Sequence, residues 1–169
     1  MVEFGDFNLV DAYQMMDDKN LGWVAAPQML NFIVESGFFA HKDDVYTFFR
    51  RFDKDCDSRL LYSDFCDAVC PKEISYAHAL NSRPPKYVHN KQIPKKNWFT
   101  SATREHYIKL FKAFFEMDEA IELSKRKVMR SPTFNIHDAF QAIDVYRDGK
   151  LTISDFKNFM QRNGYNSTE

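Results

Sequence analysis

The chain has 169 residues, a net charge of −1, and a composition that is 44% hydrophobic and 16% aromatic. A charge so close to zero argues against nucleic acid as a partner, and the absence of a long apolar run argues against a membrane-spanning helix. The length predicts one elongated domain or two small ones. The three cysteines point to a reducing compartment, and the first residues lack the pattern of a signal peptide. Both observations favour a cytoplasmic location.

An internal repeat relates two distant segments, 7–38 and 134–165, which align without a gap. Each segment opens with Asn and, three residues later, Asp, which is typical of a capped helix start. Each ends in a Gly that follows an apolar helix. The identical pairs are Phe7/Phe134, Asn8/Asn135, Asp11/Asp138, Ala12/Ala139, Gln14/Gln141, Asp17/Asp144, Gly22/Gly149, Asn31/Asn158, Phe32/Phe159 and Gly37/Gly164. The repeat predicts two helix–loop–helix units in the same register.

Residues 53–64 carry the clearest chemical signal in the chain. Acidic side chains alternate and then close the stretch, and Ca²⁺ takes six to eight oxygen ligands. This stretch resembles the twelve-residue EF-hand loop of the calmodulin superfamily, with apolar helical stripes before and after it. The resemblance implies a third helix–loop–helix unit at 42–70. Its candidate metal ligands are Asp53, Asp55, Asp57, Arg59, which stands where the backbone carbonyl is the ligand, and Asp64.

Two positions of this loop depart from the EF-hand pattern. Ser58 stands where the chain turns with positive φ and Gly is usual. Asp64 stands where a longer Glu usually binds through both oxygens, and its shortness shifts the preference from Ca²⁺ toward Mg²⁺. The sequence leaves two alternatives open, a loop that binds metal and an EF-hand fold whose loop is empty.

The two loops of the repeat are poorer in acids. The candidate ligands of loop 144–155 are Asp144, Asp148, Lys150 and Asp155, but Tyr146 stands at the third position in place of an oxygen ligand. In the first copy Leu21 and Gln28 replace the middle and closing acids, which predicts a loop without metal. We therefore expect at most one or two bound ions.

A basic, proline-containing linker follows at 71–100. Pro71, Pro84, Pro85 and Pro94 exclude a continuous helix. Lysines and arginines alternate with aromatic residues, which fits a docking segment for an acidic surface. It also fits a strap that packs against the rest of the chain, and the sequence favours the strap.

A long helix is predicted at 101–130. One face carries a stripe of apolar residues at helical spacing, and the segment contains no loop acids. The stripe consists of Tyr107, Leu110, Phe111, Phe114, Met117 and Ile121.

The predicted fold is all-α, in three parts. Residues 1–70 form an EF-hand pair joined by a short β-ribbon in which Val24 faces Leu60, residues 71–100 form the linker, and residues 101–169 form the long helix and a third, unpaired EF-hand. We expect 134–165 to pack on the long helix, or to pair with a second copy of the chain or with another protein.

A weaker resemblance links the chain to the calmodulin-like proteins of protist cilia and cytoskeleton. It rests on Phe134–Phe140 and on Thr103 and Arg104 at the start of the long helix. It implies a non-enzymatic adaptor that binds an amphipathic helix of a partner protein in a cytoskeletal or ciliary assembly. The alternative is a regulatory subunit of a phosphatase or kinase complex. The sequence contains no nucleophile–base set, which argues against an enzyme.

Overall fold

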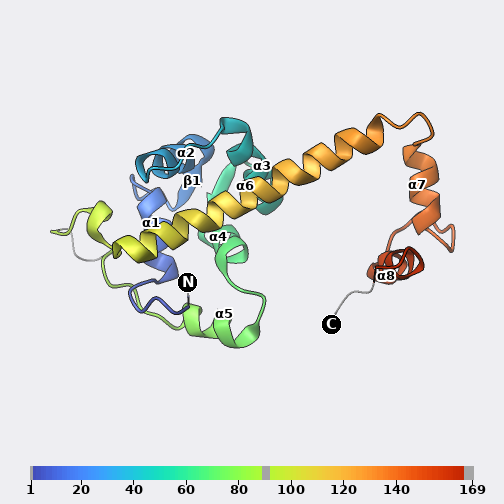
Figure 1. The fold of residues 1–169 in the computed structure, drawn as a ribbon. Coiled ribbons are helices and arrows are strands. Elements are labelled where there is room, and N and C mark those ends of the chain that lie inside the picture. The colour runs from blue at the N-terminus through green and yellow to red at the C-terminus, as the bar shows by residue number, and fades with distance from the viewer. Residues whose placement is uncertain (1, 89–91, 166–169) are drawn as a thin grey trace. The chain divides into compact units, whose positions relative to one another are not determined.

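The computed structural model describes residues 2–88 and 92–165. These residues form eight α-helices, one short 3₁₀ helix and a two-stranded antiparallel sheet (Figure 1), which confirms the mostly helical class. The chain divides into two compact units, Met1–Ala120 and Ile121–Glu169. The division falls inside the long helix, so the first part of that helix belongs with the residues before it. None of the described helices is long and apolar enough to cross a membrane.

The first unit begins with two helix–strand–helix segments. Helix α1 (Leu9–Met16), strand β1 (Trp23–Ala25) and helix α2 (Ala26–Glu35) form the first segment. Helix α3 (Lys42–Phe52), strand β2 (Arg59–Leu61) and helix α4 (Tyr62–Val69) form the second. The strands pair antiparallel with Val24 opposite Leu60, which is the predicted register, and both side chains are buried.

Helix α6 (Ser101–Met129) packs against both segments and completes the core of the first unit. Tyr107 is fully buried, its hydroxyl donates to the carbonyl of Ala12 over 3.1 Å, and its ring lies 5.7 Å from that of Phe7. One turn further on, Phe111 packs edge-on against Phe48 at 5.8 Å. Figure 1 shows helices α1 to α4 gathered around this first part of α6. The long helix thereby covers the apolar sides of both segments.

The buried stripe of α6 differs from the predicted one at its far end. Tyr107, Phe111 and Phe115 are buried, whereas Met117 and Ile121 are exposed. These three buried aromatic residues are four apart, so the stripe that they form turns slowly around the helix. The prediction continued the stripe in steps of three and four, and therefore chose the wrong side beyond Phe114.

The basic linker is a strap on the first unit. It contains helix α5 (Ile74–Asn81), between Pro71 and Pro84, and the short 3₁₀ helix η1 (Lys95–Asn97). Arg83 donates to the backbone carbonyls of Phe4 and Phe7 over 2.7 and 2.8 Å. Residues 89–91 of the linker lie outside the described residues. The interpretation of the linker as a strap is therefore confirmed where the structure describes it.

Asp11 fastens the strap to helix α1. Its carboxylate is fully buried and accepts hydrogen bonds from the backbone N–H groups of Lys86, Tyr87 and Val88 at 2.8 to 3.2 Å. The Asn8 side chain, which caps α1, donates to the same carboxylate over 2.5 Å. One acidic group thus satisfies donors from two segments that are 75 residues apart.

The second unit contains the end of α6, helix α7 (Ile136–Ile143) and helix α8 (Ile153–Arg162). Asn135 caps α7, as the sequence pattern predicts for a helix start, and Thr152 caps α8. The repeat is therefore visible in the local structure, because Asn135 occupies the position of Asn8.

We predict that Asp11→Asn lowers the free energy of unfolding by about 2 to 3 kcal/mol, because an amide has one acceptor oxygen for these buried donors and loses the charge. Asp138→Asn is the matched control, since Asp138 is the exposed repeat counterpart of Asp11. Its unfolding midpoint should equal that of the unaltered chain. Urea unfolding followed by circular dichroism measures both, and equal midpoints for the two variants would contradict the role of Asp11.

Candidate metal centre

All three loops begin with an aspartate that ends a helix. In each loop a carboxylate oxygen of this residue accepts a hydrogen bond from the backbone N–H of the sixth loop residue. The pairs are Asp17 with Gly22 at 2.8 Å, Asp53 with Ser58 at 2.8 Å, and Asp144 with Gly149 at 2.9 Å. The shared bond fixes the same turn in each loop, so the loops have the common register that the repeat predicts.

The middle loop brings three carboxylates together. Oxygen atoms of Asp53, Asp55 and Asp57 all lie within 4.8 Å of one another. Asp53 is 7% exposed, and its Oδ1 atom has no hydrogen-bond partner among the described residues. A buried carboxylate oxygen without a partner is costly, so this atom is placed as a metal ligand would be.

The closeness of these acids has a local electrostatic effect. A side-chain hydrogen bond with Asp53, which favours the protonated form, raises the pKa of the Asp55 carboxyl above its usual range, and repulsion from the charges of Asp57 and Asp53 adds to this shift. A bound cation would remove this repulsion. The donors of the cluster are all oxygens, which suits a hard cation such as Mg²⁺ or Ca²⁺.

Asp64, which closes the loop, caps the following helix. Its Oδ2 atom accepts the backbone N–H of Leu61 over 3.0 Å, and the side chain is buried. Gln28 and Asp155 make the same bond, to Ala25 and Thr152 respectively, each over 2.8 Å. The closing residue therefore stabilises a helix start in every loop, whatever its metal role.

Arg59 places its charged group over an aromatic ring. The guanidinium lies 4.7 Å from the ring centre of Trp23, across the sheet, and 3.9 Å from the carboxylate of Asp57. This contact holds strand β2 against β1 at the edge of the carboxylate cluster.

The candidate ligands of loop 144–155 do not gather in this way. Asp144 is buried, but its two oxygens accept the N–H groups of Asp148 and Gly149 at 3.3 and 2.9 Å. Asp155 accepts the N–H of Thr152 at the start of α8, and Tyr146 is 80% exposed. The N–H of Lys150 bonds to Asp148 over 2.9 Å. In the part of the chain that the structure describes, the cluster at Asp53 is the one group of three or more metal-ligating side chains.

The hydroxyl of Tyr13 joins the first two loops, a contact that the sequence analysis did not identify. It lies 2.9 Å from the carbonyl oxygen of Gly22 and 3.0 Å from that of Leu60. Burial and the nearby Asp17 and Asp64 raise the pKa of this phenol, so it remains a donor. The third loop has Phe140, which has no hydroxyl, at the same repeat position. This difference between the two copies was the sequence signal that could have identified the contact.

No protein-family model matches this chain, and no curated protein matches it.

We predict that Ser58→Gly stabilises the first unit by about 1 kcal/mol, because Ser58 has φ of +65° and a non-glycine residue is strained there. Gly22 and Gly149 occupy the same turn in the other loops. Ser36→Gly is the control, since Ser36 has φ of −81° and should gain nothing. Urea unfolding followed by the fluorescence of Trp23 and Trp98 measures both, and a loss of stability in Ser58→Gly would contradict the strain.

Proposed function

We propose that this chain is a calmodulin-like EF-hand protein, without enzymatic activity, that binds one Ca²⁺ ion in loop 53–64 and a helix of a partner protein on its second unit. The observation that carries the metal assignment is the buried, unpartnered Oδ1 atom of Asp53 inside a cluster of three aspartates. The cytoskeletal or ciliary setting is the one that the sequence resemblance implies.

The EF-hand assignment rests on four features of the loops. Each loop lies between two helices, each uses its first aspartate to bind the sixth N–H, and two of the loops pair through a short antiparallel ribbon. The closing residue of each loop caps the second helix. These features recur at fixed loop positions, as expected if the three segments have one architecture.

In this assignment Asp53, Asp55 and Asp57 hold the ion, and Arg59 would add its backbone carbonyl. Asp64 would contribute the oxygen that its capping bond leaves free. Three carboxylates and a short closing residue favour binding weaker than in a full EF-hand. Mg²⁺ is the competing ion, since it accepts fewer protein ligands and keeps several waters.

The partner helix is assigned to the second unit because the first is already covered. Tyr107, Phe111 and Phe115 of α6 fill the apolar side of the first two helix–loop–helix segments. A partner helix could bind there only by displacing α6 from fully buried contacts. The first unit therefore acts as a closed, constitutive structure.

The repeat shows what the second unit leaves uncovered. Phe7 and Leu9 are 0% and 2% exposed, whereas their counterparts Phe134 and Ile136 are 36% and 66% exposed. Met29 is fully buried, but its counterpart Phe156 is 49% exposed. The same face that binds α6 in the first copy is thus free in the third, and a helix with aromatic side chains suits it.

We predict that metal-free protein binds one Ca²⁺ ion with a Kd of the order of 10⁻⁵ to 10⁻⁴ M in the presence of Mg²⁺. Asp53→Asn should abolish the binding, because the amide keeps an acceptor for the Ser58 N–H but lacks the charge. Asp144→Asn is the matched control, with the same change at the start of the third loop. Isothermal titration measures all three proteins, and binding that is retained in Asp53→Asn but lost in Asp144→Asn would overturn the assignment.

We predict that the exposed face of the second unit binds the dye anilinonaphthalene sulfonate, and that the double variant Ile136→Ser, Phe156→Ser reduces its emission several-fold. Ile74→Ser is the control, since Ile74 is an exposed apolar residue of α5, outside this face. Circular dichroism checks that the helices persist. Light scattering identifies the occupant: a dimer that the double variant makes monomeric would replace the partner helix by a second copy of the chain. Equal emission from all three proteins would contradict the proposed face.

A further inference from the structure

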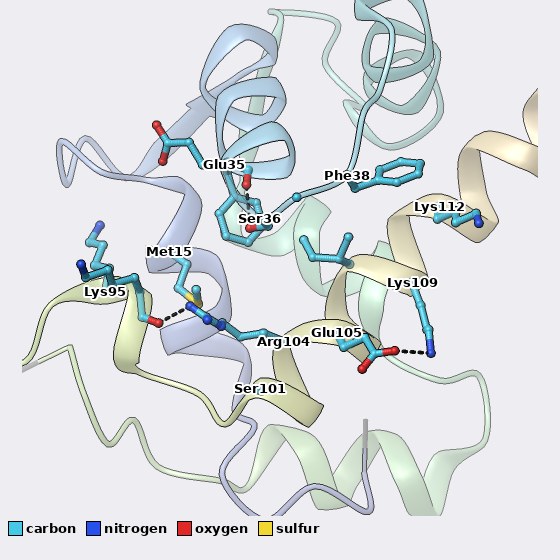
Figure 2. A pocket seen from close by; sticks show the side chains of 14 residues that line it. Met15, Glu35, Ser36, Phe38, Lys95, Ser101, Arg104, Glu105, Lys109 and Lys112 are labelled. Carbon is cyan, nitrogen blue, oxygen red and sulfur yellow. Dashed lines mark hydrogen bonds and ion pairs between the residues drawn. The ribbon is translucent and has the colours of Figure 1, made fainter.

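The first unit contains a cavity of about 620 Å³ that the metal site does not use. Figure 2 shows it between the end of α2, the short helix η1 and the first three turns of α6. Its volume lies within the usual range of ligand sites. Every lining residue belongs to the first unit, so the cavity is part of one compact body.

The floor of this cavity is apolar. Met15 and Ile108 are nearly buried, and Phe32 and Phe38 line it while remaining half-buried. The ring of Phe38 also stacks on that of Phe115, at 6.3 Å. These residues form a hydrophobic base on which one apolar side chain could rest.

The rim of the cavity is basic. Five cationic residues line it against two carboxylates, Glu35 and Glu105. The cations are Lys95, Lys96, Arg104, Lys109 and Lys112. The excess of three positive charges contrasts with the net charge of −1 for the whole chain. The local charge of this cavity therefore favours an anionic ligand.

Two of these cations are available to a ligand. Lys95 donates to the carbonyl oxygens of Gln14 and Asp17, and Arg104 donates to the carbonyl of Lys96. Lys109 pairs with Glu105 at 2.7 Å. Lys96 is exposed, and Lys112 makes a looser pair with Glu116, at 3.6 Å, on the surface. Such a surface pair contributes little and is easily exchanged for a ligand carboxylate.

The cavity is a groove elongated along α6, named the basic groove below. Its lining residues on that helix run from Ser101 to Lys112, which corresponds to about 16 Å at 1.5 Å per residue. An extended peptide covers that length with about five residues. A compact anion such as phosphate would contact only one end of such a groove.

We propose that this groove binds an acidic peptide segment of a partner protein, with one apolar side chain on the floor formed by Met15 and Ile108 and flanking carboxylates at Lys96 and Lys112. This site does not depend on the metal at Asp53 or on the apolar face of the second unit. It also explains part of the basic character of the linker, because Lys96 remains free after the strap has packed.

The test uses the full chain and a fluorescein-labelled peptide of sequence Glu-Glu-Phe-Glu-Glu-Leu, with anisotropy as the readout. The double variant Lys96→Glu, Lys112→Glu should weaken binding at least tenfold. Lys72→Glu is the control, because it alters one exposed lysine of the same unit outside the groove. Raising the salt from about 50 to about 300 mM should weaken binding to the unaltered chain, as expected for rim charges.

Two further probes separate the alternatives. The peptide Glu-Glu-Ser-Glu-Glu-Ser should bind markedly more weakly, because it lacks the apolar anchor, and removal of metal with EDTA should leave the affinity of the unaltered chain for the original peptide unchanged. No binding of the acidic peptide, or equal binding to the double variant, would overturn the proposal. Binding to phosphatidylserine vesicles without binding to the peptide would also overturn it, and would assign the basic rim to a membrane surface.

Discussion

The burial of Tyr107 holds the first unit together. Its ring lies against those of Phe7, Phe32, Phe65 and Phe111, and its hydroxyl bonds to the backbone of α1. A helix–loop–helix pair has an apolar side that must be covered, and here the chain covers it with its own helix. The closed form of the first unit and the site assigned to the partner both depend on that packing.

The internal repeat shows how one sequence pattern acquires two roles. The first and third copies share caps, loop register and turn glycines, yet one copy is buried at positions where the other is exposed. The difference lies in what surrounds each copy, because α6 and the second segment pack on the first copy. A repeat that lacks these neighbours retains an apolar surface suited to recognition.

Local features were predictable from the sequence. The pairing of Val24 with Leu60 and the gathering of Asp53, Asp55 and Asp57 follow from loop register, which is fixed over a dozen residues. The positive φ of Ser58 follows from the same register. Geometry of this kind depends on the spacing of neighbouring residues in the sequence, so it can be predicted from the sequence.

Long-range contacts were not predictable in the same way. The bonds of Asp11 to the strap join residues 75 to 77 positions apart, and no periodicity marks them. The buried stripe of α6 ends at Phe115 rather than Met117, because the shape of the surface opposite selects which residues are covered. The basic groove combines residues from four separate segments, so its charge excess is visible only in three dimensions.

The contact of Lys95 with the first loop has a consequence for the proposed metal response. The ammonium group bonds to the carbonyl oxygens of Gln14 and Asp17, so a covalently attached cation lies where α1 ends and the loop begins. Two paired loops that both bind ions can respond cooperatively, whereas a pair with one fixed charge and one exchangeable ion has a single site. Its occupancy can rise no more steeply than a Hill coefficient of 1 allows, so going from 10% to 90% saturation takes about an 80-fold change in ion concentration. In the proposed assignment the first unit would therefore report the metal level as a graded quantity and not as an abrupt switch.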